Sequence, residues 1–125
     1  MTTYWLIAIA GGLGAVARFA AVRAVVGMLG NGFPYGTLLV NVVGSFLMGF
    51  LSWLLLHKWA IDESIRYAVL VGLLGGFTTF SSFSLEALQL IEQQAWLKAL
   101  FYMSSSVIAC VFMCFLGLFL AKQLS

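Results

Sequence analysis

Charged residues are scarce in this chain of 125 amino acids. Only 8% are Asp, Glu, Lys or Arg, whereas 63% are hydrophobic. A soluble domain carries about 25% charged residues, so the composition excludes a water-soluble globular protein and a disordered tail. Six basic residues and a net charge of +2 form no basic patch, which argues against nucleic acid as a partner. The composition therefore indicates an integral membrane protein of one domain, residues 1–125.

Cysteine and histidine are also few, which removes most catalytic chemistry. Cys110 and Cys114 lie one helical turn apart in an apolar stretch, and without a nearby His or acid they are a weak metal ligand set. We interpret them as helix-packing residues. His57 stands alone beside Lys58, and the sequence has no nucleophile–base pair, metal cluster or phosphate-binding loop. The chain is therefore not expected to be an enzyme.

The uncharged stretches predict an all-α membrane protein with four transmembrane helices. A helical span needs about 20 apolar residues, and we expect spans at about 4–26, 36–56, 66–88 and 97–121. Amphipathic aromatic residues are enriched at membrane interfaces, and here they lie near the proposed ends: Tyr4, Trp5, Tyr35, Trp53, Trp59, Tyr67 and Trp96. Because the number of spans is even, both termini are expected on one side.

The orientation in the membrane is not determined by the basic residues. Lys58, Arg66 and Lys122 lie on the side of the termini, and Arg23 and Lys98 lie on the other, with Arg18 if it reaches outward. This balance gives no positive-inside bias. A single weakly specified orientation and dual topology, in which copies insert both ways and pair antiparallel, both stay open. Four short spans enclose little by themselves, which favours a dimer.

Polar and small residues recur at helical spacing inside the spans. The second span carries Thr37, Asn41, Ser45, Gly49 and Ser52, and the fourth carries Tyr102, Ser106, Cys110 and Cys114. Such stripes form either helix-packing seams or ion paths. Small residues let helices approach closely, so we expect close helix packing at Gly11, Gly12, Gly14, Gly72 and Gly76.

The third span contains a stretch that is poorly suited to a continuous helix. Gly75 to Ser84 combines two glycines with β-branched and hydroxyl residues. A break there would free backbone carbonyls, which must be satisfied by protein or by a bound ion. The alternative is that the hydroxyls bond back to their own helix. Phe80 and Phe83 share one face, with Phe77 on the same row, and their positive ring edges can solvate an anion beside the neutral amide donor of Asn41.

At these residues the sequence closely resembles the Fluc (CrcB) family of small bacterial fluoride channels. Three segments carry the resemblance, in order along the chain: Gly11 to Arg18, Pro34 to Phe46, and Gly72 to Glu86. The second and third motifs are long, and their combination in this order is highly specific. With the span pattern, the resemblance covers nearly the whole chain.

The resemblance implies an antiparallel, dual-topology homodimer in the lipid bilayer of the bacterial inner membrane, with two fluoride pores along the subunit interface and the third helix broken mid-membrane. It also implies a structural Na⁺ at the dimer centre, held by the backbone carbonyls of Gly75 and Thr78 from each subunit. The pore residues would be Asn41, Phe80 and Phe83, followed by a polar track of Thr37, Ser81, Tyr102 and Ser106, with Glu86 near its end. Arg18 would lie near a pore entrance. Cys110 stands where we expect a serine of the track.

The function implied is passive export of cytoplasmic fluoride. Neutral donors suit this task, because a pore must bind the ion weakly enough to release it. One alternative is a small dual-topology, proton-coupled multidrug exporter. It needs a buried acid, typically in its first helix, whereas Glu86 is the only acid in any expected span. A second alternative is a non-transporting membrane subunit, in which the polar stripes would serve packing alone.

Overall fold

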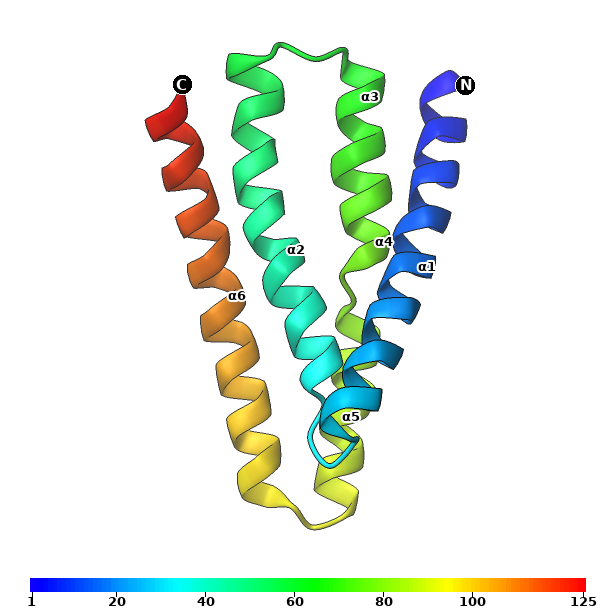
Figure 1. Cartoon of the computed structure of the whole chain (residues 1–125), viewed down its shortest axis with the longest axis vertical. Coiled ribbons are helices and arrows are strands. Elements are labelled where there is room, and N and C mark those ends of the chain that lie inside the picture. The colour runs from blue at the N-terminus through cyan, green and yellow to red at the C-terminus, as the bar shows by residue number, and fades with distance from the viewer.

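The computed structural model describes all 125 residues, which form four long helical segments joined by short turns (Figure 1). In the second and third segments, short π-helical stretches continue the helix. In chain order the elements are α1 (Thr2–Leu29), α2 (Tyr35–Trp53), η1 (Leu54–Lys58), α3 (Glu63–Tyr67), η2 (Ala68–Leu74), α4 (Gly75–Phe77), α5 (Phe80–Glu92) and α6 (Trp96–Leu124). Both termini lie at the same end of the molecule, as expected from an even number of spans (Figure 1).

Each segment is long and apolar enough to cross a bilayer, and each extends beyond the span expected from the sequence. Only 19 of the 125 residues are buried, and large apolar side chains cover the outside of the helices. Such a surface is stable in hydrocarbon and not in water. The chain is therefore a multi-pass membrane protein, and the predicted all-α architecture with four membrane-spanning helices is confirmed.

Local sequence signals explain where several helices begin or end. The turn between α1 and α2 contains Gly30, which has a positive φ of 78° that glycine tolerates without strain. Asp62 precedes α3, and its carboxylate accepts a hydrogen bond from the Ser64 N–H at 3.1 Å. Thr79 precedes α5, and its hydroxyl accepts one from the Ser82 N–H at 3.1 Å. Both residues are typical N-caps.

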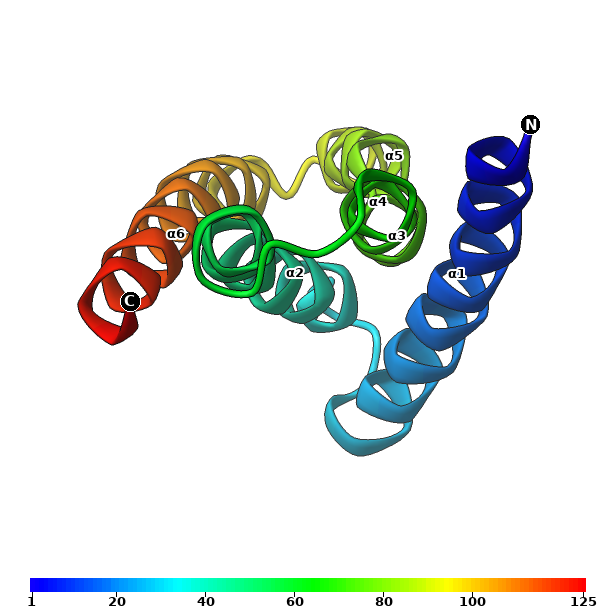
Figure 2. The ribbon, with the colours of Figure 1, turned by 90° about the horizontal axis from the view of Figure 1, so that it is seen from above.

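Glycines allow the helices to pack in two close pairs (Figure 2). In the first pair, α2 packs on α6, and a Cβ on Gly49 or Gly117 would collide with a backbone carbonyl of the facing helix. In the second pair, α1 packs on η2 and α4, and Gly14 and Gly76 show the same close approach. The close packing predicted at Gly14 and Gly76 is therefore confirmed. Gly12 is different, because a Cβ on it would meet nothing within 4 Å.

The helical backbone of the third segment is interrupted at two residues. Helix α4 ends at Phe77, and α5 begins at Phe80. Between them Thr78 (φ −91°, ψ 158°) and Thr79 (φ −153°, ψ 124°) are extended. Figure 1 shows this interruption between the labels α4 and α5. Backbone carbonyls at the end of α4 and backbone N–H groups at the start of α5 therefore lack their usual helical partners. The candidate site is built around this interruption.

Candidate functional site

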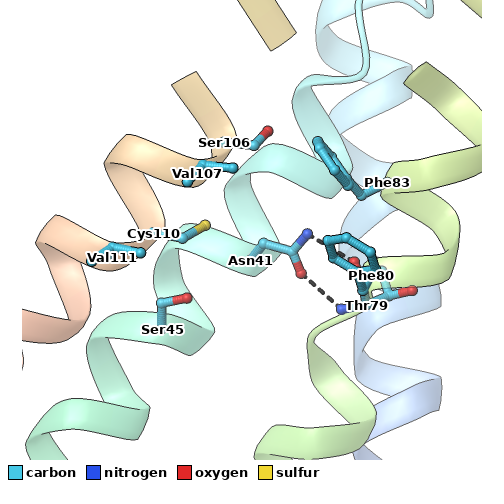
Figure 3. Close-up of a pocket in the computed structure, with 9 residues that line it drawn as sticks. All are labelled: Asn41, Ser45, Thr79, Phe80, Phe83, Ser106, Val107, Cys110 and Val111. Carbon is cyan, nitrogen blue, oxygen red and sulfur yellow. Dashed lines mark hydrogen bonds between the residues drawn. The ribbon is translucent and has the colours of Figure 1, made fainter. Parts of the chain in front are cut away.

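Asn41 of α2 holds the interruption through both ends of its side-chain amide. Its Nδ2 donates to the carbonyl oxygen of Thr79 at 3.0 Å, and the Thr79 N–H donates to its Oδ1 at 2.8 Å (Figure 3). Because only the amide oxygen can accept from an N–H, the second bond fixes which way the amide points. One N–H of Asn41 then remains for another acceptor.

Arg18 of α1 holds the other side of the interruption. Its Nε donates to the carbonyl oxygen of Gly76 at 3.0 Å. The resemblance implies an arginine near a pore entrance, whereas this contact brings the guanidinium against the end of α4. A cation is favourable at this position, because the carboxyl end of a helix carries partial negative charge.

Two carbonyls next to the interruption have no donor. The Leu74 carbonyl accepts from both the N–H and the hydroxyl of Thr78, each at 3.0 Å. No backbone or side-chain hydrogen bond reaches the carbonyl oxygens of Gly75 or Thr78. Gly75 is exposed, and a Cβ there would meet nothing closer than 3.8 Å. These two oxygens are therefore free to accept from, or coordinate, a group outside the chain.

A cavity of about 280 Å³ lies between α2, the interruption and α6. Polar groups from three segments meet in it, with apolar side chains between them (Figure 3). The lining consists of Asn41, Ser45, Thr79, Phe80, Phe83, Ser106, Val107, Cys110 and Val111. Phe77 is not among them: it precedes the extended residues, and the helical spacing that would place it on the row of Phe80 does not continue across them.

The two phenylalanines of α5 differ in exposure. Their ring centroids lie 5.4 Å apart, with an angle of 42° between the planes. Phe80 is 76% exposed within the single chain, whereas Phe83 is 9% exposed and packs against Tyr102 at 5.1 Å. The aromatic row thus runs from an open face of the molecule to its interior.

Polar side chains continue from Phe83 along α6 and α2. Tyr102 is completely buried, and its hydroxyl donates to the carboxylate of Glu86 at 3.3 Å. Thr37 and Ser106 are also buried, and the Ser106 hydroxyl has no hydrogen-bond partner in the protein. Buried hydroxyls are rarely left unpaired, so Ser106 indicates a place where water can form a hydrogen bond or an anion can accept one.

A second cavity of about 490 Å³ opens at the end of the molecule opposite the termini. Its lining is mainly polar, and Thr37 and Glu86 lie at its inner side. Nearer the turns the lining includes Asn31, Gln93 and Lys98. The linings of the two cavities include Thr37, Glu86, Ser106, Phe83, Phe80 and Asn41, and Tyr102 joins this set through its bond to Glu86.

Some polar residues of the predicted stripes line this site, whereas others form hydrogen bonds within their own helix. Ser45 lines the first cavity, although the sequence pattern alone did not single it out as a site residue. Ser52 donates to the Gly49 carbonyl of its own helix, and Ser84 donates to that of Phe80, both at 2.9 Å. In the third segment the back-bonding considered from the sequence therefore occurs at Thr78 and Ser84, and neither residue lines the cavity. Ser81 is exposed and lies 3.3 Å from the Thr79 hydroxyl.

Comparison with known proteins identifies the family. A family model described as CrcB-like protein, Camphor Resistance (CrcB), matches residues 5–118. The chain is 47% identical over 116 residues to a protein of Magnetococcus marinus, covering 93% of this chain and 94% of the relative. It is 44% identical over 124 residues to one of Caulobacter vibrioides, covering 98% of each.

A third relative, from Methylococcus capsulatus, is 48% identical over 119 residues, which cover 95% of this chain and 52% of that longer protein. All three relatives are named fluoride-specific ion channel FluC. The match extends through all four helical segments and includes every residue of the site described above. The family predicted from the three sequence motifs is therefore confirmed: this chain belongs to the CrcB family.

Proposed function

We propose that the chain forms a fluoride-selective, passive anion channel that exports cytoplasmic fluoride across the bacterial inner membrane. The relatives named as fluoride-specific ion channels support a channel rather than an enzyme. The observation that carries the proposal is the row of neutral donors and phenyl rings in an otherwise apolar protein. Asn41, Ser106 and the rings of Phe80 and Phe83 line one cavity.

Fluoride is small and strongly hydrated, so a pore must replace much of its water shell. The free N–H of Asn41, the unpaired hydroxyl of Ser106 and the positive edges of the Phe80 and Phe83 rings can each face an anion. None of them carries a full charge, and an ion bound to them can leave again. Flow would follow the electrochemical gradient, and a negative-inside potential drives the anion outward.

The polar track supplies the rest of the path. From the second cavity, fluoride would pass Thr37, Tyr102 and Glu86, and then Ser106, before it reaches the phenylalanines. The Tyr102 hydroxyl donates a hydrogen bond to Glu86, which partly offsets the charge of the carboxylate at the point where an anion would approach. Ser81 lies on the exposed side of α5 and would join the track only from the open face.

The open face of the first cavity supports a dimer. Phe80 is 76% exposed, and Asn41 and Ser45 lie behind it. In hydrocarbon this arrangement would leave polar groups next to lipid, which is unfavourable. A second copy could close the face. With the balanced basic residues at the two ends, the second copy would be antiparallel, and two such cavities would give two pores in each homodimer.

A sodium ion at the centre of that dimer fits the free carbonyls. Na⁺ is a hard cation and prefers neutral or anionic oxygen ligands. The carbonyl oxygens of Gly75 and Thr78 have no donor, and Gly75 lies on an exposed part of the third segment. Two oxygens from each copy would hold the ion. The positive charge of the ion would satisfy the carbonyl oxygens freed at the interruption. It would also offset the repulsion between the dipoles of these carbonyls and a fluoride ion.

Ion efflux from liposomes tests the channel directly. The purified protein is reconstituted in liposomes loaded with potassium fluoride or potassium chloride, valinomycin is added, and ion-selective electrodes follow the efflux. Rapid loss of fluoride with retention of chloride is expected. Absence of flux of either ion, from protein shown to be dimeric, would contradict the channel and favour a non-transporting membrane subunit or the proton-coupled exporter.

The antiparallel arrangement needs a separate test in the native membrane, because reconstitution randomises orientation. A protease-sensitive tag at the C-terminus is exposed to external protease in sealed inner-membrane vesicles. Dual topology predicts one digested and one protected population in the same vesicles. Digestion of all chains, or of none, would contradict it.

A further inference from the structure

Cys110 lies inside the proposed path and not in a helix-packing seam. It lines the first cavity together with Asn41, Ser45 and Ser106, and its sulfur is turned toward Asn41 (Figure 3). Cys114, one turn further along α6, does not line this cavity. The backbone carbonyl of Cys114 instead lies at the close crossing of α6 with Gly49 of α2. The two cysteines are both free thiols, but their surroundings differ.

Polar groups with unused hydrogen-bonding capacity lie at the cavity beside Cys110. The Ser106 residue is 6% exposed and its hydroxyl has no partner in the protein, and one N–H of Asn41 is also unused. Unpaired polar groups that line one space are usually satisfied by water or a ligand. A volume of about 280 Å³ leaves room for several water molecules. The Cys110 thiol therefore shares this cavity with hydrogen-bonding groups, and water that enters the cavity can reach the sulfur.

Water in this cavity would change the metal-binding chemistry of the Cys110 thiol. The thiolate is the form that binds metals, and burial in apolar surroundings suppresses it. Water in the cavity can stabilise the thiolate and accept the proton. A thiolate is a soft ligand that prefers soft metal ions. No carboxylate or imidazole lines this cavity, so hard metal ions have no comparable site there.

We propose that Cys110 is a binding site for thiophilic metals such as mercury(II), and that occupation of this site blocks the path. The inference rests on the proposed channel function. With mercuric chloride the Cys110 thiol gives its proton to water, and the thiolate sulfur forms a bond to mercury. One chloride leaves, so that a neutral S–Hg–Cl group remains. That group projects into the cavity beside Asn41 and occupies the space through which fluoride would pass.

The experiment uses the two cysteines as a matched pair. Fluoride efflux is measured from liposomes containing the wild type, Cys110→Ser, Cys110→Ala or Cys114→Ser, before and after mercuric chloride, and again after dithiothreitol. Each inhibition is expressed relative to the untreated rate of the same variant. The wild type and Cys114→Ser are expected to lose most of their flux and to regain it with dithiothreitol. The two Cys110 variants are expected to lose none.

Intact-mass spectrometry of the same samples measures mercury binding independently of flux. A mercury adduct that the Cys110 variants lack and Cys114→Ser retains would support the site. Full flux in wild-type protein that carries this adduct would show that Cys110 is outside the path and overturn the proposal. Absence of the adduct would overturn it as well. If untreated wild type does not conduct, the channel function fails, whereas a Cys110-dependent adduct would still support the metal site.

Discussion

Asn41 and Thr79 form a closed pair of hydrogen bonds between two transmembrane segments. The Asn41 amide donates to the Thr79 carbonyl at 3.0 Å and accepts from the Thr79 N–H at 2.8 Å. Thr79 lies where the helical backbone is interrupted, so its peptide groups have lost their helical partners. One side chain thus satisfies both of them, and the same side chain keeps one N–H unused and lines the first cavity.

This pair makes Asn41→Asp an informative variant. Aspartate has almost the same shape and can still accept from the Thr79 N–H, but it cannot donate to the Thr79 carbonyl or to an anion when it is ionised. Loss of a hydrogen bond that leaves a buried partner unpaired costs about 1–3 kcal/mol, which corresponds to about 5- to 150-fold in rate if it acts on the transition state. We expect fluoride efflux to fall by at least that amount.

The matched control for Asn41→Asp is Ser52→Ala on the same helix. Ser52 bonds only to the Gly49 carbonyl of α2 and does not line the cavity, so it should conduct like the wild type. Size-exclusion chromatography verifies that both variants keep the wild-type oligomeric state. Wild-type flux in Asn41→Asp would remove Asn41 from the path.

Phe80→Ile tests the role of the ring edges. Because Phe80 is 76% exposed within one chain, its replacement should leave the fold of that chain unchanged. Isoleucine keeps an apolar side chain but has no ring edge with partial positive charge. We expect fluoride flux to be lost in the liposome assay while the assembly elutes at the wild-type position.

Phe112→Ile is the control for Phe80→Ile. Phe112 is 58% exposed on α6 and lines none of the cavities of the site, so its flux should be unaffected. If Phe80→Ile instead loses its assembly and any remaining dimer still conducts, the ring serves packing, as in a structural subunit.

The sequence predicted the helices and the family, but not which helix faces meet. Uncharged stretches locate the four segments because a bilayer tolerates few charges. Periodicity then shows which residues share one face of a helix. It carries no information about the facing helix, and the bond from Arg18 to Gly76 joins residues 58 positions apart. The same holds for Asn41 and Thr79, which are 38 positions apart.

The polar stripe of the second span shows the same limit within one helix. Thr37, Asn41 and Ser45 line cavities, whereas Gly49 packs against α6 and Ser52 bonds back to its own helix. A stripe at constant spacing therefore lines cavities at one end and serves helix packing at the other. The change lies between Ser45, which lines a cavity, and Gly49, where α2 packs closely on α6. Only the tertiary structure defines this point.

Glycine substitutions should separate packing from open surface. A Cβ on Gly49 would collide with the carbonyl of Cys114, whereas a Cβ on Gly12 would meet nothing within 4 Å. Overpacking a close contact costs about 1–3 kcal/mol, and backbone atoms at a helix crossing cannot easily move away. Gly49→Ala should therefore lower the melting temperature in detergent and the yield of monodisperse protein. Gly12→Ala should match the wild type in both. Equal melting temperatures for the two variants would contradict this close packing of α2 on α6.

Replacement of Arg18 should weaken the end of α4. A hydrogen bond from a charged group is worth about 1.5–3 kcal/mol, and Arg18→Gln removes the charge as well as the Nε donor. We expect a lower melting temperature and slower fluoride efflux. Arg23→Gln is the control, because Arg23 is on the same helix but exposed, and stacks only on Phe19. If Arg18→Gln keeps wild-type stability but its conductance becomes more sensitive to salt, the charge acts at a pore entrance instead, as the resemblance implied.

Removal of sodium tests the two free carbonyls of the third segment. An ion that binds only the folded dimer stabilises it in proportion to RT ln(1 + [Na⁺]/Kd), so the melting temperature should rise with sodium and not with equal concentrations of choline. If the ion is held too tightly to remove, elemental analysis after desalting into sodium-free buffer should instead find one sodium per two chains. The carbonyls of Gly75 and Thr78 cannot be deleted by substitution, so the ion itself is the variable. Protein without bound sodium whose melting temperature and fluoride flux are the same in both salts would contradict the proposed central ion.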